Sequence, residues 1–180
     1  SDVSAQIPNP KSRIPNLFLV GFMASGKSTV GRALAERLGV RFIDLDEMIK
    51  TMAGCTIAQI IQDQGEAHFR QLETDHLRQA AAGEAAVIAL GGGAFTQAIN
   101  RALIAQAGVS VWLDAPFELC WERIQRDAVV RPLAATENEA RIRFEQRIPL
   151  YEQARLRIPI AADTQPETIA AEILAHLSHS

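Results

Sequence analysis

Short runs of apolar residues alternate along the chain with longer segments in which apolar positions recur every three or four residues. The short runs are typical of strands buried on both faces, and the longer period is typical of amphipathic helices. The runs predict strands at Leu17 to Val20, Arg41 to Asp44, Ala86 to Leu90, Val109 to Leu113 and about Arg157 to Ile160. The longer period predicts helices at Lys27 to Leu38, Asp46 to Met52, Thr56 to Gln64, Glu66 to Ala82, Gln97 to Ala107, Pro116 to Arg126 and Pro166 to Leu177. Together they predict an α/β protein whose parallel sheet is covered by helices on both faces.

Two segments depart from this simple alternation. Residues 46–82 contain successive helical patterns with no strand between them: Thr56 and Gln59 fit a capping box, and Gly65 is typical of a helix end followed by a new start. An insertion of this kind is expected at the carboxyl edge of the sheet, where ligands bind in this class of fold. Residues 127–147 are rich in arginine and glutamate and predict a mobile lid that contains a helix.

Length and composition restrict the protein to a few classes. A chain of 180 residues is long enough for one buried core and short for two domains, so residues 17–178 are predicted to form one domain. Residues 1–16, with three prolines and no apolar run, are expected to be a flexible leader. The chain is 48% hydrophobic with a net charge of -3, which argues against a face that binds nucleic acid.

The cysteines and the hydropathy bear on the compartment. Cys55 and Cys120 lie far apart, in neither a metal-ligand spacing nor a disulfide framework, which favours a reducing environment. No stretch approaches the roughly 20 apolar residues that a membrane-spanning helix needs. We therefore expect a cytoplasmic monomer that binds neither nucleic acid nor membrane.

Residues 21–28, Gly-Phe-Met-Ala-Ser-Gly-Lys-Ser, match the phosphate-loop pattern G-x-x-x-x-G-K-[ST] and lie between a predicted strand and a predicted helix. In such a loop, backbone N–H groups and the positive end of the helix bind phosphate oxygens. Lys27 adds a positive charge for the outer phosphates, and the Ser28 hydroxyl is placed to ligate Mg²⁺. The alternative is a glycine-rich turn with an exposed lysine, which would produce this pattern by chance in about one chain in a few hundred. The loop predicts binding of Mg-ATP.

Acidic residues and glycines follow the next two strands. Asp44 and Asp46 are separated by one residue, which on an extended chain would place both carboxylates on the same side. One could then face the metal while the other holds an acceptor hydroxyl in line with the γ-phosphate and takes its proton. The alternative is that Asp46 only caps the following helix. Gly91, Gly92 and Gly93 end the third strand and leave backbone amides open to a ligand.

Several arginines suggest that the acceptor is an anion. Arg70 lies on the predicted insertion with Glu73 one turn later, so that the carboxylate can orient the guanidinium. Arg126, Arg131 and Arg147 lie in or beside the predicted lid. In an acidic protein such a cluster favours an anionic ligand, although any single arginine could instead belong to a solvated surface.

Six segments, taken in order, resemble the shikimate kinases, which belong to the nucleoside-monophosphate-kinase-like group of P-loop proteins. They are the phosphate loop and residues 42–46 (Phe-Ile-Asp-Leu-Asp), 69–73 (Phe-Arg-Gln-Leu-Glu), 90–93 (Leu-Gly-Gly-Gly), 131–133 (Arg-Pro-Leu) and 147–151 (Arg-Ile-Pro-Leu-Tyr). The resemblance covers nearly the whole chain, from Leu17 to about Leu177. It implies an α/β/α sandwich with a five-stranded parallel sheet in the order 2-3-1-4-5. It also implies ATP-dependent phosphorylation of the 3-hydroxyl of shikimate, with Mg²⁺ as cofactor.

The resemblance assigns roles to individual residues. It implies that shikimate is bound by Asp46, Phe69, Arg70, Gly92, Gly93 and Arg147. It implies that ATP is bound by Ala24, Ser25, Gly26, Lys27, Ser28, Thr29, Arg126, Arg131 and Thr164, with Arg126 packing on the adenine. It places Mg²⁺ on Ser28, with Asp44 in the outer shell, and gives Lys27, Asp46 and Arg131 the catalytic roles. The chain departs from the family at Ala24, where a glycine is usual, and in the length of the stretch between Arg126 and Arg131.

Two other functions are compatible with parts of this pattern. A gluconate-type sugar-acid kinase would share the phosphate loop and an anionic acceptor, but the Asp44 to Asp46 segment, Phe69 with Arg70, and the glycine triplet favour shikimate. A degenerate kinase fold that only binds ligands would be expected to lack Lys27, Asp46 or Arg131, and all three are present.

Overall fold

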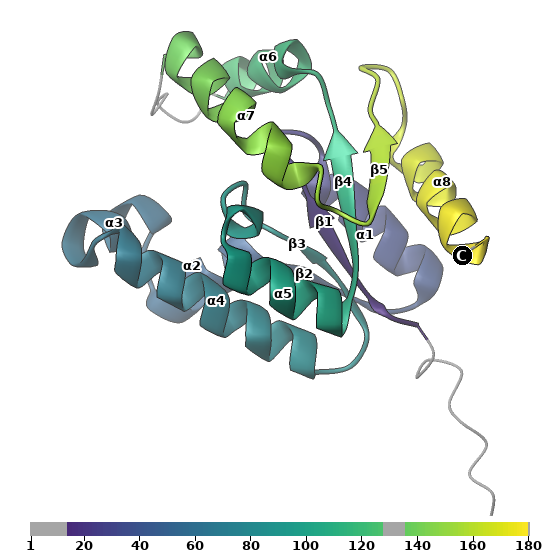
Figure 1. The fold of residues 1–180 in the computed structure, drawn as a ribbon, viewed down its shortest axis with the longest axis horizontal. Helices are drawn as coiled ribbons and strands as arrows, with labels where there is room; N and C mark the ends of the chain where they lie inside the picture. Colours follow the sequence, from purple (N-terminus) through teal and green to yellow (C-terminus); the bar gives the residue numbers. More distant parts are fainter. Residues whose placement is uncertain (1–13, 128–135, 180) are drawn as a thin grey trace, which may run out of the picture.

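The computed structural model describes residues 14–127 and 136–179, and it confirms the predicted sheet (Figure 1). Five parallel strands lie in the order β2-β3-β1-β4-β5. Their bounds are β1 Asn16–Val20, β2 Arg41–Asp44, β3 Ala86–Ala89, β4 Gly108–Asp114 and β5 Leu156–Pro159. Each overlaps its predicted strand and differs by at most one residue at either end.

The helices also follow the predicted pattern. They are α1 Lys27–Leu38, α2 Leu45–Ala53, α3 Ile57–Gln64, α4 Glu66–Ala82, the 3-10 helix η2 Ala94–Thr96, α5 Ala98–Ala107, α6 Phe117–Asp127, α7 Glu137–Tyr151 and α8 Pro166–Ser178. The Thr56 side chain and Gln59 form the predicted capping box at the start of α3. Gly65 ends α3 and precedes α4 with a φ of 90°, which confirms the predicted break between two helices.

The start of α2 corrects one prediction about the acidic pair. The Asp44 side chain accepts a hydrogen bond of 3.2 Å from the Glu47 amide and is therefore the N-cap of α2. Asp46 lies in the first turn of the helix, so the expectation that it shares an extended backbone with Asp44 is wrong. The alternative that Asp46 caps the helix is wrong as well, because Asp44, two residues earlier, is already the N-cap.

The direction of the crossovers fixes the layers. From β1, the chain passes through α1 to β2, toward one edge of the sheet. From β3, it passes through α5 to β4, toward the opposite edge. Because parallel crossovers are right-handed, α1 and α5 must cover opposite faces. Helix α8 packs against α1, and α4 packs against α5, as Figure 1 shows. The result is the predicted three-layer α/β/α sandwich.

The core lies along the central strands. All residues of β1 and β3 are buried, as are the middle residues of β4, which explains why these strands appear as uninterrupted apolar runs. The phosphate loop, Asp44, the glycine triplet and the start of α6 all follow the carboxyl ends of strands. They therefore meet at one edge of the sheet, where open α/β sheets bind ligands.

Most of the predicted lid is a regular helix. Helix α7 occupies residues 137–151, and Thr136 and Glu139 form a capping box at its start. Arg131 and the rest of residues 128–135 lie outside the described part of the chain, so the lid's mobility stays a prediction. None of the helices in residues 14–127 and 136–179 is long and apolar enough to cross a bilayer.

Candidate active site

The phosphate loop connects β1 to α1 and adopts a strained turn. Gly26, with a φ of 102°, is the N-cap of α1, and Ala24 has a φ of 59°. Among the described residues, Ala24 is the single non-glycine residue with a positive φ. This left-handed conformation costs a residue with a side chain about 1–2 kcal/mol, which explains why glycine would suit the position.

Lys27 folds back over its own loop. Its Nζ donates hydrogen bonds to the carbonyl oxygens of Gly21, at 2.6 Å, and Phe22, at 3.0 Å. Loss of hydration lowers the pKa of Lys27 to about 8, an effect that the nearby Asp46 carboxylate partly opposes. The loop therefore carries a cation that is incompletely compensated by protein groups, as a site for the outer phosphates of a nucleotide requires.

The structure pairs the two residues that the sequence assigns to the metal. The Ser28 Oγ donates a hydrogen bond of 2.8 Å to Asp44 Oδ2, while Asp44 Oδ1 caps α2. Within the described ranges, no group of three or more His, Cys, Asp or Glu side chains could hold a metal. One hydroxyl with one carboxylate beside a phosphate loop fits Mg²⁺, which takes few protein ligands and completes its shell with water and substrate phosphates.

Each glycine of the triplet lies against a different side chain of the predicted acceptor site. A Cβ atom added at Gly91 would lie 2.6 Å from Asp46 Oδ1. One at Gly92 would lie 2.9 Å from Arg147 Nη1, and one at Gly93 would lie 2.6 Å from Arg70 Nη2. A side chain at any of the three positions would force the neighbouring carboxylate or guanidinium group to move. Sequence reasoning attributed the glycines to the approach of a ligand; the structure shows that they also allow the acceptor-site side chains to reach the loop.

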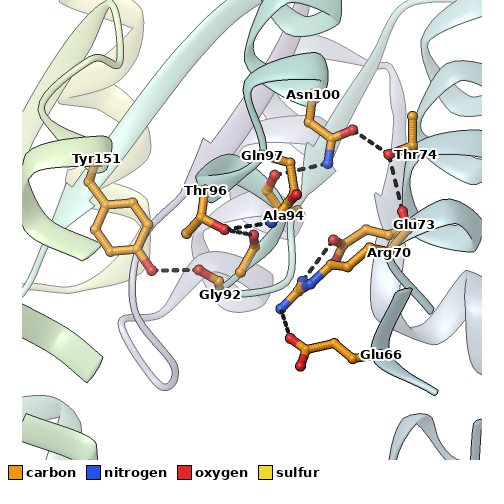
Figure 2. Close-up of polar contacts among 11 residues, drawn as sticks. Glu66, Arg70, Glu73, Thr74, Gly92, Ala94, Thr96, Gln97, Asn100 and Tyr151 are labelled. Carbon is orange, nitrogen blue, oxygen red and sulfur yellow. Dashed lines mark hydrogen bonds and ion pairs between the residues drawn. The ribbon is translucent and has the colours of Figure 1, made fainter. Parts of the chain in front are cut away.

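Arg70 is oriented by carboxylates from its own helix (Figure 2). Its guanidinium pairs with Glu73 at 2.9 Å and with Glu66 at 3.6 Å, and the Glu73 side chain is only 1% exposed. The prediction that Glu73 orients Arg70 is confirmed. The guanidinium carbon also lies 5.3 Å from the ring centroid of the buried Phe69.

Asp46 carries a buried oxygen without a protein partner. Of the buried side-chain polar atoms in the described chain, two lack a hydrogen bond, Asp46 Oδ1 and Ser25 Oγ. Burial raises the pKa of Asp46, the neighbouring Asp44 carboxylate raises it further, and Lys27 opposes both. A buried, unpaired acceptor is costly unless a ligand satisfies it, so Asp46 is suited to receive a proton from a bound hydroxyl.

Helix α7 is docked onto the phosphate loop by aromatic rings. Phe144 of α7 meets Phe22 of the loop edge to face at 5.2 Å and Phe117 of α6 at 5.5 Å. This contact brings Arg147, one turn further along α7, to 5.9 Å from the ring centroid of Phe22. The helix that carries Arg147, the second arginine of the predicted acceptor site, is therefore in direct contact with the phosphate loop.

A hollow of about 510 Å³ adjoins the phosphate loop on the side of α6 and α8. It brings together the described residues of the predicted ATP site, Ala24, Ser25, Gly26, Lys27, Ser28, Thr29, Arg126 and Thr164. Arg126 lines it with a side chain that is 70% exposed and paired with Glu122.

Arg123 is a residue of this hollow that sequence reasoning missed. It is half-buried and donates a hydrogen bond of 3.0 Å to the Ala24 carbonyl. The sequence contained one signal for this. Cys120, which is buried, lies three residues before Arg123 on α6, and residues three apart lie on the same face of a helix.

Comparison with known proteins identifies the family. The family model for shikimate kinase matches residues 23–178. The chain belongs to the shikimate kinase family. A shikimate kinase of Nitratidesulfovibrio vulgaris is 42% identical over 174 residues, which cover 94% of this chain and 99% of that protein. One from Synechococcus is 42% identical over 160 residues, which cover 87% and 84% of the two chains.

Solved structures agree with this family assignment. Shikimate kinase from Acinetobacter baumannii, solved in complex with shikimate, is 40% identical, with a TM-score of 0.86 over 94% of this chain and 96% of that one. A gluconokinase from Sinorhizobium meliloti has a TM-score of 0.58 at 19% identity, so this likeness shows the fold alone. The predicted resemblance to the shikimate kinases is confirmed.

The depressed pKa of Lys27 predicts proton uptake when nucleotide binds. With a pKa of about 8, half of the free protein lacks this proton at pH 8, and bound phosphates favour the charged form. Binding of Mg-ADP should take up roughly half a proton at pH 8 and little at pH 6.5, and affinity should fall above pH 8. Calorimetry in two buffers of different ionisation enthalpy measures the uptake. Equal uptake by a Lys27→Met variant would assign the proton to another group.

Proposed function

We propose that the protein transfers the γ-phosphoryl group of Mg-ATP to the 3-hydroxyl of shikimate. The observation that carries this proposal is the convergence of Asp46, Arg70 and Arg147 on one glycine loop. Two guanidinium groups suit the carboxylate of the acceptor, and the single carboxylate suits its hydroxyl groups. The three side chains lie beside the phosphate loop, so an acceptor bound by them would meet the nucleotide.

The chain's own residues account for the chemical step. The acceptor hydroxyl oxygen forms a bond to the γ-phosphorus while the bond from that phosphorus to the bridging oxygen of ATP breaks, giving ADP. The hydroxyl proton passes to Asp46 Oδ1, whose raised pKa suits it for a transient proton. Lys27 stabilises the charge that develops on the transferred group, and Arg131 is assigned to the same phosphates.

Ser28 and Asp44 would hold Mg²⁺ at the outer phosphates, Ser28 directly and Asp44 through the outer shell. When bound, Mg²⁺ neutralises phosphate charge and orients the γ-phosphoryl group. For the adenine end, Arg123 is better supported than Arg126, because Arg123 is half-buried against the phosphate loop whereas Arg126 is largely exposed and paired with Glu122. We assign the adenine contact to Arg123 and a peripheral role to Arg126.

We also infer a cytoplasmic monomer that binds small molecules and neither nucleic acid nor membrane. Cys55 and Cys120 are both free thiols, half-buried and buried, which suits a reducing compartment. The net charge of -3 disfavours anionic polymers and surfaces. Large exposed apolar side chains in the described ranges are spread over different elements, namely Met23, Met52, Ile61, Ile99 and Ile142.

A coupled assay of ADP release tests the proposed acceptor. The panel is shikimate, quinate, gluconate and nucleoside monophosphates, each with Mg-ATP. Shikimate should exceed gluconate and the nucleotides in kcat/KM by at least about 1,000-fold, because those acceptors cannot match the arrangement of Asp46 and the two arginines. A higher kcat/KM with gluconate would favour a sugar-acid kinase, and no turnover with any acceptor would favour a protein that only binds ligands.

A further inference from the structure

Tyr151, the chain's single tyrosine, has no role in the mechanism above. It is the last residue of α7 and is 1% exposed, with its ring 6.1 Å from that of Trp112. Its hydroxyl donates a hydrogen bond of 2.6 Å to the carbonyl oxygen of Gly92, a residue 59 positions earlier (Figure 2). The bond joins the end of α7 to the glycine loop of the acceptor site.

Tyr151 and Arg147 lie one turn apart on the same side of α7. Gly92 is thus approached by both side chains: the Tyr151 hydroxyl binds its carbonyl oxygen, and Arg147 Nη1 lies 2.9 Å from the position that a Cβ atom would take. Pro149 lies between them inside the helix and cannot donate a backbone hydrogen bond. The last turn of α7 is therefore weakened, which increases its dependence on the bond from Tyr151.

The opposite side of the glycine loop is held separately. Asn100, which is wholly buried, donates 2.9 Å to the Ala94 carbonyl and accepts 2.8 Å from Thr74. Thr74 lies on α4 one turn after Arg70, and Thr96 donates 2.6 Å to the Gly93 carbonyl (Figure 2). Two consecutive hydrogen bonds through Asn100 thus connect the loop to α4, the helix of Arg70, whereas Tyr151 connects it to α7.

We propose that Tyr151 is a positioning residue that fixes the distance between the glycine loop and Arg147, and with it the fit of the acceptor's carboxylate. This proposal rests on the proposed function of the same site. Burial raises the pKa of Tyr151 to about 12, so its hydroxyl remains a donor at any working pH. Without the bond, Arg147 and Arg70 would still be present, but the spacing between the two guanidinium groups would no longer be fixed.

Tyr151→Phe removes the hydroxyl and keeps the ring. We expect the KM for shikimate to rise about tenfold, with kcat and the KM for ATP within about twofold, because only the acceptor's carboxylate loses its fixed contact. The matched control is Ser110→Ala, which removes a buried hydroxyl that accepts 2.9 Å from the Arg155 amide, away from the site. Ser110→Ala should lower the melting temperature about as much as Tyr151→Phe does, and it should leave the KM for shikimate and the KM for ATP unchanged.

An unchanged shikimate KM in Tyr151→Phe, with a melting temperature lowered as in the control, would overturn the proposal and leave Tyr151 a structural residue. Absence of shikimate turnover in the wild type would instead refute the proposed function, so the two failures are distinguishable.

A second measurement needs no substitution that could prevent folding. Because the chain has one tyrosine, fluorotyrosine incorporated during expression reports on position 151 alone. Its fluorine resonance should shift when shikimate binds and shift much less with Mg-ADP alone. An equal response to both ligands, or no response to saturating shikimate, would contradict a specific link to the acceptor site.

Discussion

Lys27→Ala is expected to lower kcat by at least about 1,000-fold, equivalent to about 4 kcal/mol of barrier, while leaving the fold intact. The lysine supplies charge to the transferred phosphoryl group, whereas the loop around it is shaped by the backbone turn at Ala24 and Gly26. In the described part of the chain, its Nζ donates hydrogen bonds only to two carbonyl oxygens of its own loop, so its loss breaks no contact between separate elements of the fold. Steady-state kinetics and thermal melting measure the two parts of the expectation.

Lys50→Ala provides a control with the same change of charge. Lys50 lies on α2 and pairs with the exposed Glu47, so its loss should change kcat by less than about threefold. If Lys27→Ala kept activity within about tenfold of the wild type, the lysine would have no major part in the transfer.

Arg147→Lys is expected to weaken shikimate binding by at least about 30-fold, or about 2 kcal/mol, while ATP affinity stays within about twofold. The variant keeps the positive charge but loses the planar fork that can bind a carboxylate through two hydrogen bonds. A shikimate analogue without its carboxylate should bind the wild type poorly and lose little more on going to the variant, because both changes remove the same interaction. Calorimetry on all four combinations gives the coupling energy.

Arg143→Lys is the matched control, since Arg143 is exposed one turn earlier on the same helix and is not among the side chains that lie against the glycine loop. It should leave shikimate affinity unchanged. If the loss of binding free energy caused by Arg147→Lys and the loss caused by removing the carboxylate simply add, Arg147 does not touch the carboxylate.

Much of the fold could be predicted because its signals are local. Buried strands such as β3 appear as apolar runs, and the phosphate-loop pattern fixes one strand, one turn and one helix at once. The start of α2 was misplaced because Asp44 and Asp46 are both good N-cap residues, and only the packing of β2 decides which one caps the helix. The order of the strands came from the family resemblance rather than from local pattern.

The site was predictable where a residue type has one strong chemical use. Lys27, Ser28 and Arg70 with Glu73 are of this kind, and the structure pairs Ser28 with Asp44 and Arg70 with Glu73. Arg123 was missed because the sequence does not show which of the two arginines of α6 lies against the phosphate loop until the packing of the helix is known. The bond from Tyr151 to Gly92 joins residues far apart in sequence, and no local pattern encodes it.

The proposed reaction is tested most directly by the structure of its product. After incubation of the protein with Mg-ATP and shikimate, phosphorus–proton correlation NMR identifies the carbon that carries the new phosphate. We expect one phosphate ester, coupled to the proton at carbon 3, formed in step with ADP and absent with Lys27→Ala. A phosphate on another hydroxyl, or ADP formed without any shikimate ester, would contradict the proposed function.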